Sequence, residues 1–247
     1  MEISDHLASL SADGRSLASA ARQAGPDAPV PTCPKWQVRD LLRHTGTVHR
    51  WATAFVVEGH RAYRPDDGEP DLDGAALLDW FTEGHGRLVD ALYSAPAGLR
   101  CWTFLPAPSP LAFWARRQAH ETCIHRVDAE SARGGALTPV PPSLAVDGID
   151  ELLAGFHARA TSRVRSGAPC TLLVHAVDTE TAWTVRLSDG PPRTVRGGDA
   201  AGPVDCTLSG TAEALYLALW NRAPLSSVEV SGDAGVATLW AENSAVI

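Results

Sequence analysis

The segment RQAHETCIHRVDAE, residues 117–130, places two histidines and an intervening glutamate within six positions. A metalloprotease zinc helix carries its two histidines four residues apart. His120 and His125 are five apart, so on a helix they diverge by about 140° and cannot share one ion. Glu121 and His125 are four apart and lie one above the other on the same face. The segment therefore predicts a helix that offers one carboxylate and one imidazole to the protein interior, and it excludes the protease site.

A third ligand is available in the segment WQVRDLLRH, residues 36–44. His44 shares an apolar helical stripe with Trp51, and a polar group on a core-facing stripe needs a partner. Together with Glu121 and His125 it would form a two-histidine, one-carboxylate set, as in catalytic zinc sites that keep one position open. Non-haem iron accepts the same ligands. The pattern also fits a core histidine that simply pairs with a glutamate across a helix interface.

Apolar residues recur at three and four positions through the first half of the chain, which predicts helices. Gly25-Pro26 and the proline-rich segment after it end the first helix. Four helices of this length with moderate connections predict an antiparallel bundle. The expected ranges are residues 5–24, 36–57, 71–93 and 111–132.

Helix breakers cluster in GGALTPVPP, residues 134–142, and mark the best domain boundary. We expect a bundle over residues 1–135 and a smaller domain over 142–247. The second part alternates apolar and polar residues as half-buried strands do. It predicts an α+β domain with helices at 144–163, 211–221 and 234–241, and strands near 171–178, 182–189, 193–197, 204–210 and 227–232.

Composition limits the classes of function. The chain has 247 residues, a net charge of -8 and 45% apolar residues, which predicts a folded protein without a nucleic-acid surface. No apolar run is long enough for a membrane span, and the first residues do not resemble a signal peptide, so we expect a cytoplasmic protein. The five cysteines are widely spaced, which predicts free thiols and no cysteine zinc module.

Three stretches resemble one family. VPTCPKWQVRDLLRHTGTVHRW (residues 30–51) and HETCIHRVDAE (residues 120–130) resemble helix signatures of the mycothiol-dependent maleylpyruvate isomerase family, within the DinB-like four-helix bundles. In that pattern a metal-binding histidine follows a tryptophan by eight, as His44 follows Trp36. VDCTLSGTAEALYLALWNR (204–222) and VEVSGDAGVATLW (228–240) resemble the sterol-carrier-like second domain of the family. The resemblance covers nearly the whole chain.

The resemblance implies a divalent metal held by His44, Glu121 and His125, with zinc as the first candidate and nickel, iron or manganese as alternatives. It also implies mycothiol as a thiol cosubstrate and a small-molecule substrate. An enzyme of this kind would be an isomerase or a thiol transferase. We expect no nucleic-acid or membrane partner, and either a monomer or a homodimer.

Other residues receive more limited predictions. Arg222, at the end of a helix in the second domain, is a candidate for binding an anionic substrate, or it is a surface arginine near a helix C-terminus. Asp128 could pair with Arg117 or Arg126, or orient a ligand imidazole. Four tryptophans could line a substrate pocket or pack in the core: Trp51, Trp102, Trp114 and Trp220. His49 is expected at the surface or between helices, and Cys123 in packing.

Two other functions fit the same residues. The first is a metalloenzyme on this fold that does not use a thiol and acts in a biosynthetic pathway. The second is a non-catalytic protein whose second domain binds a small molecule, with the bundle as a scaffold. A protein of the second kind would need no metal and would keep its function after His44→Ala.

Overall fold

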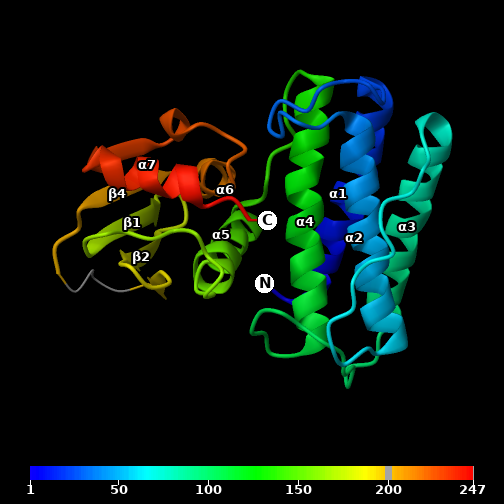
Figure 1. The fold of residues 1–247 in the computed structure, drawn as a ribbon, viewed down its shortest axis with the longest axis horizontal. Helices are drawn as coiled ribbons and strands as arrows, with labels where there is room; N and C mark the ends of the chain where they lie inside the picture. The colour runs from blue at the N-terminus through cyan, green and yellow to red at the C-terminus, as the bar shows by residue number, and fades with distance from the viewer. Residues whose placement is uncertain (198–201, 247) are drawn as a thin grey trace. The chain divides into compact units, whose positions relative to one another are not determined.

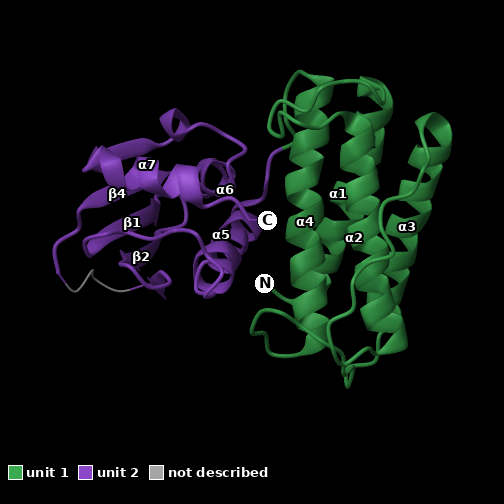
Figure 2. Cartoon of the chain, viewed as in Figure 1, with its two compact units in different colours: residues 1–138 green, residues 139–247 purple. Residues whose placement is uncertain are grey.

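The computed structural model describes residues 1–197 and 202–246. The chain divides into two compact units, residues 1–138 and 139–247, shown in different colours in Figure 2. Each unit has its own interior. None of the described helices combines the length and apolarity needed to cross a membrane.

The first unit is a bundle of four long helices, as the sequence predicted. They are α1 (Ile3–Ala24), α2 (Val38–Glu58), α3 (Gly74–Ser94) and α4 (Pro110–Arg133). Helix α4 packs against α1 and α2, and α3 packs against the other sides of the same two helices. Figure 1 shows the bundle from the side, with α4 beside α2. Chain order and packing order therefore differ, which brings α2 and α4 together.

Local sequence explains where the two site-bearing helices begin and end. Helix α2 begins with a reciprocal cap in which Gln37 and Asp40 each accept from the other's backbone, and it ends at Gly59 in the left-handed region. Helix α4 begins with the Ser109 hydroxyl, which accepts from a backbone amide, followed by Pro110. Gly134, also at positive φ, ends it.

Helix α4 is buried on almost all sides, and its burial includes polar residues. The apolar core of the bundle contains fully buried leucines and phenylalanines together with Trp114 of α4. The buried polar side chains of α4 are Arg117, Gln118, His120, Thr122, His125, Arg126, Asp128 and Glu130. Buried polar groups need hydrogen-bond partners, so this helix must draw partners from the segments packed around it.

The second unit is a mixed α/β layer structure. Its sheet has the order β3-β2-β1-β4-β5, with β1 and β4 parallel and the other pairs antiparallel. Helices α6 and α7 pack against β1 and β4. The elements are α5 (Pro142–Asp150), η1 (Glu151–Phe156), β1 (Cys170–Ala176), β2 (Thr181–Leu187), β3 (Arg193–Arg196), β4 (Cys206–Gly210), α6 (Ala212–Leu219), η2 (Leu225–Ser227), β5 (Glu229–Gly232) and α7 (Ala234–Asn243).

One predicted helix is too long. The sequence predicts a helix over 144–163, but α5 and the π-helical turn η1 end at Phe156. His157 is buried there, with its ring against Trp240 and its Nδ1 3.0 Å from the Ser162 hydroxyl. The chain leaves the helix at this point because these contacts hold the His157 side chain in the core of the unit.

Candidate metal centre

The three predicted ligands converge in the first unit. His44 on α2 places its Nε2 3.4 Å from Oε1 of Glu121 on α4. His125, one helical turn beyond Glu121, places its Nε2 3.2 Å from the same oxygen. The potential ligand atoms of the three residues all lie within 4.8 Å of one another. Glu121 and His125 meet because they are four apart on one helix, whereas His44 meets them through the packing of α2 on α4.

The spacing of these atoms fits a metal ion. Zinc ligands lie about 2.0–2.2 Å from the ion, so two of them in a tetrahedral arrangement lie about 3.4 Å apart. The observed separations of 3.2 and 3.4 Å match that value. The side chain of His44 is 34% exposed, against 8% for His125. A site open on the His44 side leaves room for a fourth ligand.

Arg117 fixes the free oxygen of the Glu121 carboxylate. Its Nη2 donates to Glu121 Oε2 over 2.9 Å, and the guanidinium is almost fully buried. Burial by itself would raise the pKa of Glu121, but hydrogen bonds to His125 and His44 and the charge of Arg117 outweigh it and hold that pKa well below its usual range. Glu121 is therefore an anion with one oxygen directed at the two imidazoles.

The second nitrogen of His125 is held by Asp128. His125 Nδ1 lies 2.8 Å from Asp128 Oδ2, and the Thr32 hydroxyl donates to Asp128 Oδ1 over 2.5 Å. Burial lowers the pKa of His125, but the hydrogen bonds to Asp128 and Glu121 reverse the effect and raise it. A carboxylate on Nδ1 leaves Nε2 to face the Glu121 carboxylate, which is the arrangement that a metal-binding histidine needs.

The segment before α2 covers the two imidazoles. The Trp36 ring lies 4.9 Å from the His44 ring and 5.9 Å from the His125 ring, measured between centroids. Backbone hydrogen bonds between Val30, Cys33 and Trp36 shape this segment into a compact turn. The Cys33 sulfur lies 3.7 Å from Asp128 Oδ2. This turn therefore contributes an indole over the ligands and a hydroxyl and a thiol against Asp128.

Two family models match this chain in the order of its two units. One describes the mycothiol maleylpyruvate isomerase N-terminal domain and matches residues 7–130. The other describes the MDMPI C-terminal domain and matches residues 143–239. The chain belongs to the mycothiol maleylpyruvate isomerase family. The prediction from the sequence that this chain is an enzyme is therefore confirmed.

Solved structures show the same fold. A crystal structure of the mycothiol-dependent maleylpyruvate isomerase matches with a TM-score of 0.63 and 14% identity, and the match covers 94% of this chain and 93% of that one. The structure of its H52A mutant matches with a TM-score of 0.64 and the same identity and coverage. At this identity the likeness concerns the fold. No curated protein matches the chain.

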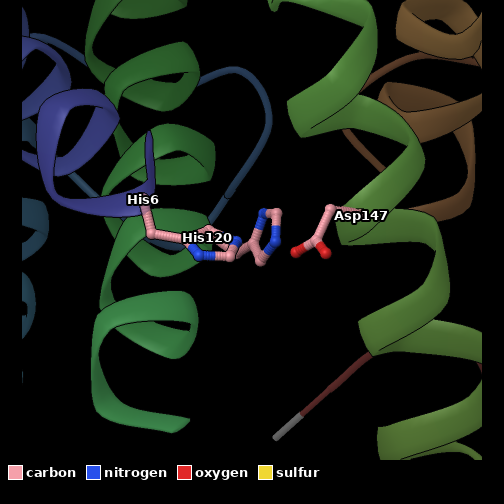
Figure 3. A group of neighbouring side chains, drawn as sticks. All are labelled: His6, His120 and Asp147. Carbon is pink, nitrogen blue, oxygen red and sulfur yellow. The ribbon is translucent and has the colours of Figure 1, made fainter. Parts of the chain in front are cut away.

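Other histidines of the family signature lie away from the ligands. His120 points to α1, where its ring meets that of His6 edge to face with centroids 6.0 Å apart (Figure 3). Asp147, drawn in the same figure, belongs to helix α5 of the second unit. His49 is fully buried between helices, with its Nε2 2.9 Å from the Thr122 hydroxyl. The surface position that the sequence allowed for His49 is wrong, and the interhelix position is right.

The remaining predicted residues have defined places. Cys123 is fully buried, as expected for packing. One aromatic cluster in the first unit contains Trp51, Trp102 and Trp114. The ring centroid of Trp51 lies 6.0 Å from that of Trp102 and 5.3 Å from that of Trp114. Arg222 follows α6 in the second unit, where its Nη1 donates to the Trp220 carbonyl over 2.9 Å. Its role toward a substrate therefore stays a prediction.

Of the residues that support the ligands, the sequence singles out only Asp128, which contacts the His125 imidazole as one of its two predicted roles requires. The signature of residues 30–51 contains Thr32 and Trp36 but predicts no role for them, and Arg117 is predicted as a partner of Asp128. In the structure Arg117 binds Glu121, and Arg126 binds Asp13 and Glu130. The four-residue spacing of Arg117 and Glu121 was the available signal. The spacing between Thr32 and Asp128, 96 residues, carried none.

Proposed function

We propose that this chain is a metal-dependent enzyme that uses mycothiol as an activated thiolate, either to isomerise a small electrophilic substrate or to transfer sulfur to it. One observation carries the proposal: the Nε2 atoms of His44 and His125 lie 3.4 and 3.2 Å from one oxygen of Glu121, close to the separation of two ligands on a tetrahedral ion. Membership in the mycothiol maleylpyruvate isomerase family supplies the thiol and the class of reaction.

A divalent cation at this site would deprotonate a coordinated thiol, which is mostly protonated in water at neutral pH. The residues of the chain prepare the place for it. Glu121 contributes the single negative charge, and Arg117 holds that carboxylate in one orientation. Asp128 keeps Nε2 of His125 directed at Glu121, and the partly exposed His44 leaves a side open for a thiol and a substrate.

The substrate chemistry follows from a thiolate nucleophile. Its addition to a conjugated carbon–carbon double bond forms a carbon–sulfur bond and leaves a single bond that can rotate. Elimination of the same thiolate restores the double bond in the other geometry, so the thiol is regenerated. In a transferase the sulfur adduct is released instead. Arg222 is our candidate for pairing with an anionic group of the substrate.

Metal content tests the ligand set directly. We expect purified protein to bind about one divalent ion per chain, and His44→Ala and Glu121→Gln to lose it while remaining folded. His175→Ala, on β1 of the second unit, is the matched control and keeps the ion. Retention of the metal by both ligand variants would reject the site.

Thermal stability tests the thiol. Mycothiol should raise the melting temperature of the metal-loaded protein, because a ligand that binds only the folded state stabilises it by mass action. His44→Ala should abolish the shift. A bound metal together with no response to mycothiol would favour the thiol-independent metalloenzyme over the present proposal.

Arg222 has its own test. Arg222→Ala should raise the KM for an anionic substrate by about tenfold or more, the effect of losing one charge-assisted hydrogen bond. Arg193→Ala, an exposed arginine on β3 of the same unit, should leave the KM unchanged. Equal kinetics for the two variants would remove Arg222 from the site.

A further inference from the structure

The loop between α3 and α4 leads to the foot of α4 in Figure 1, and a hollow of about 440 Å³ lies beside it. The hollow is lined by Arg61, residues 97–101 and residues 108–110. The backbone amide of Trp102 donates to the His60 carbonyl over 2.7 Å, which holds the segment after α2 against this loop. Arg61 and Arg100 therefore lie on neighbouring stretches of backbone and border the same hollow.

Buried and stiff residues hold the lining of the hollow in place. Leu99 is 9% exposed, and the Trp102 ring packs on Phe55 with centroids 5.2 Å apart. These two anchors lie on either side of the loop residues that open to the hollow. Pro108 and Pro110 line it as well, and the proline ring fixes φ. The backbone around the hollow is therefore ordered without a ligand.

The hollow contains two positive charges and no negative one. Arg61 and Arg100 are exposed, and neither guanidinium has a hydrogen-bond or ion-pair partner among the residues that the structure describes. Most other arginines of the first unit are paired, as Arg117 and Arg126 are. No described residue with a carboxylate lines the hollow. Burial raises the pKa of the Cys101 thiol, so this group stays neutral and adds no counter-charge.

We propose that the hollow binds the phosphate group of a small phosphate monoester between Arg61 and Arg100. A guanidinium presents a planar fork of N–H donors that matches two oxygens of a phosphate. A phosphate monoester carries about 1.5–2 negative charges at pH 7 and three acceptor oxygens, so one group can pair with both arginines. A single carboxylate has one charge and would leave the second arginine without a partner.

The hollow has room for the organic part of such a ligand. Its volume lies within the range of small-molecule sites, about 300–1,000 Å³, and is larger than a phosphate group needs. Leu99, Pro108 and Pro110 contribute apolar surface beside the two arginines. The residues therefore favour a phosphorylated small molecule over inorganic phosphate alone.

Calorimetric titration of the metal-loaded full chain tests the proposal with three probes at one ionic strength: glycerol 3-phosphate, succinate and acetate. We expect saturable binding of glycerol 3-phosphate at one site per chain, and binding that is weaker by about tenfold or more for the two carboxylates. Succinate carries two charges on separate groups, so it distinguishes a phosphate site from a dicarboxylate site. Arg61→Gln and Arg100→Gln should each weaken glycerol 3-phosphate binding about 10–100-fold, the effect of losing hydrogen bonds to a charged group.

Arg87→Gln is the matched control, because Arg87 is exposed on α3 and does not line the hollow. It removes the same charge and should leave the affinity unchanged. The start of α4 lies about 16 Å along the helix from Glu121, so His44→Ala, which should lose the metal, should still bind glycerol 3-phosphate. Absence of binding, unchanged affinity in Arg61→Gln and Arg100→Gln, tighter binding of a carboxylate, or loss of binding in His44→Ala would each overturn the proposal.

Discussion

Asp128 joins the segment before α2 to the ligand helix. Its carboxylate is fully buried, and it accepts from the Thr32 hydroxyl while its other oxygen contacts His125 Nδ1. A buried carboxylate is costly unless its lone pairs are used, so these contacts explain how it is tolerated. Because the same carboxylate also orients the imidazole, the position of the turn at Thr32 and the direction of His125 Nε2 are coupled through one side chain.

Asp128→Asn tests that coupling. The amide keeps the size of the side chain but loses the charge, and supporting groups of this kind typically change metal affinity by about 10–100-fold. We expect the zinc dissociation constant, measured by competition with a chelating dye, to rise within that range. Asp90→Asn, at an exposed position on α3, should leave it unchanged. An unaltered constant in Asp128→Asn would show that Asp128 does not support the ligand.

At the scale of elements, close helix contacts depend on glycine at a few positions. Gly14 of α1 lies under the His85 ring of α3, where an added Cβ would come 2.1 Å from a ring carbon. His85 is itself buried and stacks parallel to Phe81. The approach of α1 to α3 is therefore set by a missing side chain on one helix and an aromatic pair on the other.

Gly14→Ala should lower the free energy of unfolding by about 1–3 kcal/mol, because the added methyl must displace a ring held in the core. Gly86→Ala, on α3, meets nothing within 4 Å and should raise it by about 0.5–1 kcal/mol through helix propensity. Urea unfolding of the two variants provides the comparison. A neutral Gly14→Ala would mean that α1 and α3 can separate at little cost.

The elements also show what sequence could predict. Helical spacing pairs Glu121 with His125, and the inward-facing stripe that contains His44 predicts the third ligand. Helical periodicity reports which face a residue occupies, but not which distant segment covers that face. Thr32 and Trp36 reach the site through the packing of the turn before α2, so periodicity gave them no role. The end of the helix at Phe156 was missed for the same reason, since it depends on contacts of His157 with Trp240 and Ser162.

At the scale of the whole molecule, both units contain buried histidines that resist protonation. Burial lowers the pKa of His49 well below its usual range, and the neighbouring His85 adds to the effect. Burial also lowers the pKa of His85. In the second unit, burial lowers the pKa of His157 to about 4, against the opposing hydrogen bond with the Ser244 backbone. Acid should therefore lower the stability of both units, because these histidines stay neutral in the folded chain at a pH where they are protonated in the unfolded chain.

The sign of the effect is fixed by the direction of these shifts. Above the ordinary histidine pKa of 6.5, His157 is neutral in both the folded and the unfolded chain and its protonation does not alter stability. As the pH falls from 6.5 to about 4, the unfolded chain takes up a proton that the folded chain does not, which stabilises the unfolded state. The full difference amounts to about 3 kcal/mol at 1.36 kcal/mol per pKa unit. Below about pH 4 the folded form also takes up the proton, so this loss grows no further.

His157→Phe should therefore flatten the decline of stability between pH 6.5 and 4. The phenyl ring can keep the contact with Trp240 but cannot titrate. Urea unfolding across this range, in a chelator so that metal release does not contribute, should show the natural protein losing about 3 kcal/mol more than the variant. His175→Gln, on β1, serves as the control and should follow the natural protein. If His157→Phe declines as steeply as the natural protein, His157 is protonated in the folded chain, and the acid sensitivity of the second unit must arise from other groups.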